Sequence, residues 1–301
     1  MMVRVENIEK SYGKTCALRN VSFTVDKGEV FGIIGADGAG KTTLFRIMTT
    51  LLLADKGTCT IAGYDVVREY SKIRKISGYM PGRFSLYQDL TVEENLNFYA
   101  TLFGTTIKEN YHLIEDIYSH IEPFKNRKAG KLSGGMKQKL ALSCALIHKP
   151  SVLLLDEPTT GVDPVSRREF WGMLRKLGKE KITIIVSTPY MDEALLCDRI
   201  GLINNGEFLK IDTPHGIIES FKQTLWAVKS LDMPQLLTDL RTNHNIESCY
   251  AFGEFHHITF RNDISEQQLL DFLESKDHKD IKIKPIRANI EDCFMKLSAH
   301  E

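Results

Sequence analysis

The segment 35–42 has the residue types and spacing that suit triphosphate binding. The pattern G-x-x-x-x-G-K-[ST] lies between a short apolar run, 30–34, and a stretch with helical periodicity, 41–50. Glycines let the backbone wrap closely around phosphate oxygens, and the following helix adds positive charge at its amino end. The pattern in this context therefore predicts a nucleotide site. Its predicted members are Gly35, Ala36, Asp37, Gly38, Ala39, Gly40, Lys41, Thr42 and Thr43.

Two of these residues have predicted roles beyond the backbone cradle. The ammonium of Lys41 can reach the β- and γ-phosphates, and the hydroxyl of Thr42 can bind Mg²⁺. A glycine-rich turn without a ligand is the alternative. The flanking strand and helix argue against such a chance match.

A second candidate site follows the apolar run Val152–Leu155, where Asp156 and Glu157 are adjacent. Ligands of doubly wound α/β folds bind at the carboxyl ends of the strands. We predict that Asp156 holds Mg²⁺, directly or through water, and that Glu157 orients or deprotonates the attacking water. Two solvated acids at a strand end are the alternative. The phosphate-binding segment upstream favours the catalytic interpretation.

Hydrophobic periodicity predicts the elements that position these residues. Half-buried strands are expected at 3–8 and 21–25, and a helical region at 91–148. From residue 150 onward strands alternate with helices, which predicts a mostly parallel sheet. Beyond a boundary near residue 220, a split βαβ order is predicted. Its elements are strand 225–229, helix 233–242, strands 247–252 and 256–260, helix 265–275 and strand 281–286, followed by a helix at 290–297.

The composition is that of a globular chain with balanced charge. The 301 residues include 39 Lys and Arg and 39 Asp and Glu, so the formal net charge is zero. That balance predicts no nucleic-acid partner. No apolar run reaches the ~18–20 residues of a membrane span, and the six cysteines are scattered without a Cys-x-x-Cys pair. We expect reduced thiols, and a protein that serves a membrane only as a peripheral partner.

A third segment opens a predicted helix shortly before the acidic pair and resembles the signature of ABC ATPases. Its residues are Leu132, Ser133, Gly134, Gly135 and Met136. A flexible helix cap is the alternative for Ser-Gly-Gly, and the phosphate-binding segment favours the signature. The resemblance covers roughly residues 1–220. More narrowly, the chain resembles cassettes of multidrug-type exporters with ABC-2 permeases, in particular the first cassette of tandem-cassette chains.

The resemblance implies a fold, ligands and partners. The expected fold is α/β: a RecA-like core, an amino-terminal antiparallel β-subdomain and a helical subdomain at about 88–140 form an ABC cassette over 1–220. Residues 221–301 are expected to form a ferredoxin-like α+β accessory domain. ATP and Mg²⁺ are the implied ligands. The implied partners are a second cassette, whose ATP the signature helix faces, and an ABC-2 type permease. The implied location is the cytoplasmic face of the cell membrane.

Two further residues receive roles from the resemblance. Tyr12 matches the aromatic residue that stacks on adenine, although an aromatic beside a turn can instead cover a core edge. Asp163 matches the loop that crosses to the partner cassette. It can also cap the helix that begins near Val165.

Two positions depart from the family pattern. Gly82 stands where the family usually has a glutamine that contacts Mg²⁺ and the attacking water, and Pro189 where it has a histidine that contacts the γ-phosphate. Losing one preorganised contact can cost about 10²–10³ in rate. We therefore expect slow hydrolysis, although Glu157, Lys41 and water offer an alternative route to adequate turnover. The signature is intact, whereas the site lacks the usual glutamine and histidine. This combination favours a heterodimer with a cassette that has both residues, and a homodimer is the alternative.

Two rival functions stay open. A regulatory subunit would bind ATP as a clamp and never hydrolyse it. A non-transport ABC protein acting on ribosomes or DNA usually has two cassettes in one chain or a long inserted arm, whereas this sequence has one cassette and no basic excess. The sequence favours the first rival over the second. The transported compound is chosen by the permease and cannot be read here.

Overall fold

The computed structural model describes residues 1–262 and 264–299, and it divides into two compact units. The first spans Met1–His215, and the second begins at Gly216. The division lies within helix α7 (Pro214–Glu219), a few residues before the boundary that we predicted. None of the described helices is long and apolar enough to cross a membrane.

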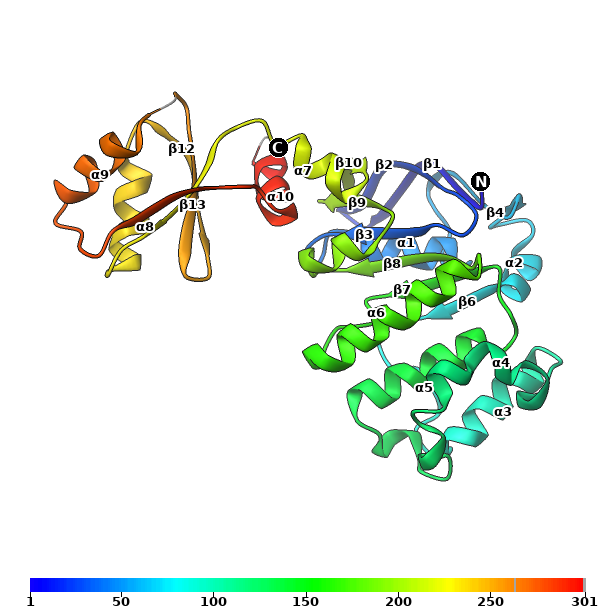
Figure 1. The fold of residues 1–301 in the computed structure, drawn as a ribbon. Helices are drawn as coiled ribbons and strands as arrows, with labels where there is room; N and C mark the ends of the chain where they lie inside the picture. Colours follow the sequence, from blue (N-terminus) through cyan, green and yellow to red (C-terminus); the bar gives the residue numbers. More distant parts are fainter. Residues whose placement is uncertain (263, 300–301) are drawn as a thin grey trace. The chain divides into compact units, whose positions relative to one another are not determined.

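A six-stranded sheet forms the centre of the first unit (Figure 1). Five strands are parallel, as predicted, and β10 adds to β9 in antiparallel fashion. The central strands β3, β7 and β8 are buried along their whole length, as expected for a parallel sheet covered on both faces. In spatial order the strands are β10 (Glu207–Asp212), β9 (Arg199–Asn204), β3 (Val30–Ile34), β8 (Thr183–Thr188), β7 (Val152–Asp156) and β6 (Ser77–Met80).

An antiparallel sheet and helix α1 (Lys41–Met48) share a core with β3. The rings of Phe23 and Phe31 stack in this core with centroids 5.3 Å apart. The first two strands are longer than the periodicity suggested, because their outer parts are exposed and lack alternation. The strand order is β2 (Thr15–Val25), β1 (Val3–Tyr12), β4 (Lys56–Ile61) and β5 (Tyr64–Asp65).

Helices gather beside β6 in the region predicted to be helical (Figure 1). A capping box opens the first of them: Thr91 Oγ1 accepts from the Glu94 amide, and the Glu94 carboxylate accepts from the Thr91 amide. After β8 the chain forms the 3₁₀ segment η3 (Met191–Leu196) in place of an α-helix. The remaining helices of this unit are α2 (Tyr70–Ile76), α3 (Val92–Leu102), α4 (Ile107–Tyr118), α5 (Gly134–Leu146) and α6 (Pro164–Lys179).

The second unit has the predicted βαββαβ order. Its four-stranded sheet is antiparallel, with the spatial order β12-β13-β11-β14. Buried side chains of α8 and α9 pack against the sheet in a separate core. The elements are β11 (Leu225–Lys229), α8 (Met233–Thr242), β12 (Ile246–Phe252), β13 (Phe255–Phe260), α9 (Glu266–Glu274), β14 (Lys282–Ile286) and α10 (Ile290–Ser298).

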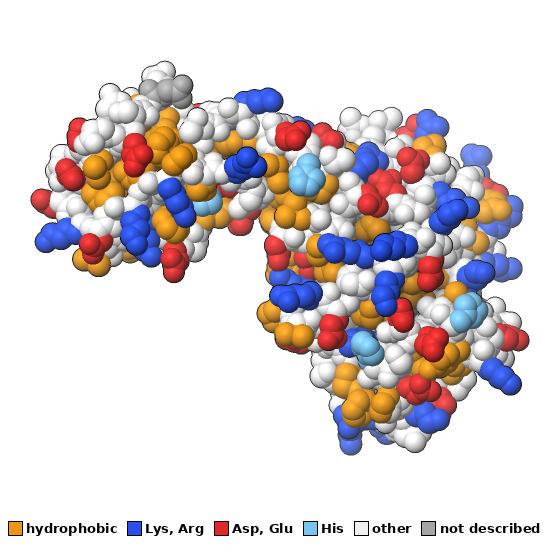
Figure 2. Space-filling view, viewed as in Figure 1, with side chains coloured by type: hydrophobic (Ala, Val, Ile, Leu, Met, Phe, Trp, Pro, Cys, Tyr) orange, Lys and Arg blue, Asp and Glu red, His pale blue; other side chains and the backbone are white. Residues whose placement is uncertain are grey.

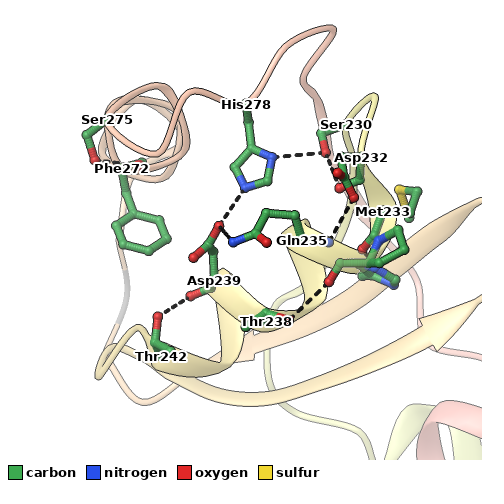
Figure 3. A network of polar contacts seen from close by, with 12 residues as sticks. Ser230, Asp232, Met233, Gln235, Thr238, Asp239, Thr242, Phe272, Ser275 and His278 are labelled. Carbon is green, nitrogen blue, oxygen red and sulfur yellow. Dashed lines mark hydrogen bonds and ion pairs between the residues drawn. The ribbon is translucent and has the colours of Figure 1, made fainter.

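A buried polar network joins three segments of this second unit (Figure 3). Nδ1 of His278 lies 3.2 Å from Ser230 Oγ, and Nε2 lies 3.1 Å from Asp239 Oδ2. The side-chain amide of Gln235 donates to the same Asp239 oxygen at 2.9 Å. The hydrogen bonds from Gln235 and then His278 lower the pKa of Asp239. The network thus ties the end of β11, helix α8 and the loop before β14 together.

We predict that Asp239→Ala lowers the stability of this unit by about 1–3 kcal/mol, because the donors of Gln235 and His278 lose their acceptor. Since the pKa of Asp239 is lowered by folding, its contribution is complete at neutral pH and is lost as the pH falls below about 4. Urea unfolding followed by hydrogen exchange in β11 and α8 measures the change. Equal protection in Asp239→Ala and in the exposed control Glu274→Ala would contradict the prediction.

Candidate nucleotide-binding site

The loop between β3 and α1 has a shape that only glycine tolerates at key positions. Gly38 and Gly40 have φ of 82° and 103°, a region that other residues rarely adopt. A Cβ on Gly40 would lie 2.5 Å from the carbonyl oxygen of Ala17, and one on Gly35 would lie 2.2 Å from that of Ile203. The loop therefore packs tightly on neighbouring backbone while it leads into the amino end of α1.

Lys41 is buried at the centre of this loop, with 3% of its surface exposed. Its ammonium donates to the carbonyl oxygens of Gly35 at 2.8 Å and Ala36 at 2.9 Å. The same nitrogen lies 3.2 Å from Oε1 of Glu157. The structure thus brings the cation of the first predicted site to the carboxylate of the second.

Asp156 ends β7 and is buried, next to the hydroxyls of Ser187 and Thr42. Burial raises the pKa of Asp156, and hydrogen bonds from Ser187 and Thr42 oppose that rise. Mg²⁺ prefers carboxylate, hydroxyl and phosphate oxygens, so the pair Asp156 and Thr42 fits this ion. Bound there, Mg²⁺ would neutralise charge on the phosphates.

Glu157 has an uncommon backbone conformation, with φ of 50°. Its amide donates to the carbonyl oxygen of Ser187 at 3.1 Å and to the Ser187 hydroxyl at 2.9 Å. Its side chain is one-fifth exposed, with Oε1 beside Lys41 and Oε2 accepting from Thr160 Oγ1 at 3.4 Å. That placement suits a group that orients or deprotonates a water molecule.

The two departures from the family pattern lie at the carboxyl ends of β6 and β8, the two strands that flank β7. Gly82 follows β6, and a Cβ built on it would lie 3.1 Å from the carbonyl oxygen of Asp156 and 3.8 Å from Glu157 Cβ. Pro189 directly follows β8. Gln88, the nearest glutamine in the sequence, instead packs against Gly130, so it does not replace the missing side chain at Gly82.

The predicted signature opens α5. Ser133 caps this helix by accepting from the Met136 amide at 3.4 Å, and Ser133 and Gly134 are exposed while Leu132 is buried. The carbonyl oxygen of Gly161 lies 3.5 Å from the position of a Cβ on Gly134. The signature therefore lies beside the 161–163 loop, with its helix amino end open to an anionic ligand.

Asp163 and Tyr12 have distinct surroundings. Asp163 caps α6, because its Oδ1 accepts from the amides of Val165 at 3.1 Å and Ser166 at 3.0 Å. The hydrogen bond from the Ser166 amide is the main reason that the pKa of Asp163 is lowered. Tyr12 ends β1 and is 46% exposed, with the Lys10 ammonium 6.0 Å from the centre of its ring.

Ser187 was not among the predicted site residues, although the structure places it against both acids. It lies opposite Asp156 in the parallel pairing of β7 and β8. A second unpredicted link is the buried Glu193, which accepts from Thr159 Oγ1 at 2.9 Å and lies 3.6 Å from Arg167. A hydroxyl at the end of a buried strand was the only signal for Ser187, and the strand order was needed to interpret it.

Comparisons with known proteins identify the family to which this chain belongs. The ABC transporter family model matches residues 18–160. The chain is 46% identical over 208 residues to the probable multidrug ABC transporter ATP-binding protein YbhF of Escherichia coli, covering 68% of this chain and 36% of YbhF. It is 38% identical to the linearmycin resistance ATP-binding protein LnrL of Bacillus subtilis, covering 70% of this chain and 69% of LnrL. The chain thus spans little more than a third of YbhF.

Solved structures extend the similarity to the fold. The dimeric, post-hydrolysis structure of the ATP-binding cassette MJ0796 with ADP and Pi matches with a TM-score of 0.64 and 28% identity. The match covers 70% of this chain and 98% of that structure. An ATP-binding subunit of an ABC transporter matches with a TM-score of 0.67 and 27% identity, covering 73% and 93%. The chain therefore belongs to the ATP-binding proteins of ABC transporters, and its first unit has the fold of an ABC ATPase cassette.

Proposed function

We propose that this chain binds ATP with Mg²⁺ and hydrolyses it to drive export through a separate ABC-2 type permease. The observation that carries the proposal is the meeting of Lys41, Asp156 and Glu157 at one edge of the sheet, with Lys41 and Glu157 3.2 Å apart. In this arrangement Lys41 binds the β- and γ-phosphates, Asp156 and Thr42 hold the ion, and Glu157 acts on the attacking water. Tyr12 stacks on adenine.

A second cassette completes the site in this proposal. The exposed amino end of α5 at Ser133 and Gly134 offers backbone amides and a helix dipole to a phosphate of that partner. Asp163 lies at the adjacent loop. The dimeric state reported for the MJ0796 cassette supports the arrangement. ATP then lies in the interface between the two cassettes. Its hydrolysis shifts the equilibrium from the joined cassettes to the separated ones.

A cleft of about 780 Å³ is the proposed docking site of the permease. It lies between α2 and β6 on one side and α3 and α5 on the other, and its lining is mostly apolar. Leu86, in the loop that follows Gly82, and Tyr99 of α3 line the cleft, so the proposal assigns this loop to permease contact. Export is supported by the names of the relatives, and the proposed location is the cytoplasmic face of the membrane.

The proposed turnover at this chain's own phosphate loop is slow. Neither Gly82 nor Pro189 can donate a hydrogen bond from its side chain to developing charge, and such contacts are worth about 10²–10³ in rate each. The intact signature serves the partner's ATP, so a heterodimer with a more complete cassette is the favoured assembly. The same two residues favour, as a second candidate, a clamp subunit that binds ATP without hydrolysing it.

A non-transport role on nucleic acid has less support. Basic and acidic side chains are interspersed across the face shown in Figure 2. That distribution matches the zero formal net charge of the chain. A polyanion would be favoured by a clustered basic surface instead.

We predict that Lys41→Ala weakens ATP binding at least 100-fold, because the buried ammonium that faces the phosphates is removed. Titration calorimetry with ATP and Mg²⁺ measures the change. Lys108→Ala, at an exposed position of α4, is the matched control and should bind as the wild type does. Unchanged affinity in Lys41→Ala would refute the site.

Replacing Glu157 with Gln separates the hydrolytic proposal from the clamp. We expect Glu157→Gln to keep ATP affinity within a few-fold and to lower the rate of phosphate release at least 100-fold, since the acid acts on the attacking water. Single-turnover phosphate release measures the rate at this chain's own site, in a complex with the permease and with a partner cassette whose own catalytic acid has been replaced. A complex with equal phosphate release and equal transport in both forms would favour the clamp subunit.

The slow site can be tested by restoring the usual side chains. We expect the double change Gly82→Gln and Pro189→His to raise ATP turnover by at least 10-fold, because two polar contacts to the site are returned. Gly82 has a backbone conformation open to other residues, although the 3.1 Å approach to Asp156 requires a small shift. Single-turnover hydrolysis gives the rate, with Gly82→Ala and Pro189→Ala as controls that add no polar group. Fast turnover of the unaltered chain alone would be inconsistent with this view.

A further inference from the structure

Ser187 is the last but one residue of β8 and is completely buried. Its hydroxyl donates to Oδ1 of Asp156 at 2.7 Å. The Ser187 hydroxyl oxygen in turn accepts from the backbone amide of Glu157 at 2.9 Å. One hydroxyl therefore bridges the side chain of the first acid and the main chain of the second.

The bridge places a constraint on Asp156 that its own strand does not supply. A carboxylate at a strand end can rotate about its side-chain bonds. The hydrogen bond from Ser187 to Oδ1 restrains that rotation and so fixes the orientation of the carboxylate beside the Thr42 hydroxyl. Partners that hydrogen-bond to metal ligands orient those ligands, and their loss typically weakens metal affinity or activity by 10–100-fold.

The bridge also supports the uncommon backbone of Glu157. With φ of 50°, this residue needs support from its surroundings to stay in the left-handed region. Its amide is shared between the carbonyl oxygen and the hydroxyl of Ser187, at 3.1 and 2.9 Å. Both contacts fix the direction in which the Glu157 side chain leaves the end of β7, toward Lys41.

We propose that Ser187 is a positioning residue that aligns Asp156 for Mg²⁺ and Glu157 for the attacking water through a single hydroxyl. The proposal rests on the proposed ATP hydrolysis. It predicts a loss of metal affinity that is separate from ATP binding. A purely structural hydroxyl would lower stability and leave metal affinity unchanged.

The test compares Ser187→Ala with Ser187→Thr, which keeps the hydroxyl. Thr183→Val is the matched control, because Thr183 is also buried on β8 and its hydroxyl also accepts from a backbone amide, that of Gly28 at 2.9 Å. For each variant, electron paramagnetic resonance follows Mn²⁺ binding in the presence of ATP. Fluorescence titration in EDTA gives the affinity for ATP alone, and phosphate release gives the rate.

We expect Ser187→Ala to weaken Mn²⁺ binding about 10-fold and to lower the rate by 10–100-fold, with ATP affinity in EDTA unchanged. Ser187→Thr should recover most of both losses, and Thr183→Val should match the wild type in all three measurements. Wild-type Mn²⁺ affinity in Ser187→Ala would overturn the proposal and leave the proposed function standing. A wild-type chain that binds no ATP would overturn both.

If Ser187→Ala does not fold, Ser187→Cys provides the same comparison with a weak thiol donor of similar size. It should show an intermediate loss of Mn²⁺ affinity. Full Mn²⁺ affinity in Ser187→Cys would also overturn the proposal, because a strong donor to Asp156 would then be unnecessary.

Discussion

The buried ammonium of Lys41 is the interaction on which the rest of the site depends. A cation removed from water must be matched by charge or by hydrogen-bond acceptors. Here the carbonyl oxygens of Gly35 and Ala36 and the carboxylate of Glu157 supply that match. Gly38 and Gly40 allow this match, because their positive φ lets the backbone wrap closely around the ammonium. A triphosphate would bring further negative charge to the same point.

The order of the parallel strands explains how segments far apart in the chain reach this cation. The strands β3, β8, β7 and β6 are neighbours, so the four loops at their carboxyl ends lie in a row. Those loops carry Lys41, Pro189, Glu157 and Gly82 respectively. Lys41 and Glu157, which keep the family pattern, follow β3 and β7. Pro189 and Gly82, which depart from it, follow β8 and β6. The signature opens α5 and is not part of this row, so it can stay intact while two residues of the row depart from the family pattern.

Much of this arrangement could be predicted from the sequence, because local signals encode it. The phosphate-binding loop has a fixed spacing, the acid pair ends an apolar strand, and the βαββαβ tail shows clear periodicity. Ser187 could not be assigned, since its role depends on the pairing of β7 with β8, which periodicity does not specify. The closeness of Gly82 to the acids likewise follows from the tertiary position of β6. No sequence pattern marks the exposed ends of β1 and β2 as strand rather than loop. None marks η3 as a 3₁₀ helix rather than an α-helix.

The central claim is that a triphosphate held at Lys41 joins this chain to a second cassette. Sedimentation of the purified wild-type chain with its partner cassette, with and without ATP and Mg²⁺, tests it most directly. We expect a species of two cassettes that forms with ATP, and that dissociates when ADP replaces ATP. Nucleotide binding without any change in sedimentation, or the absence of nucleotide binding, would contradict the account.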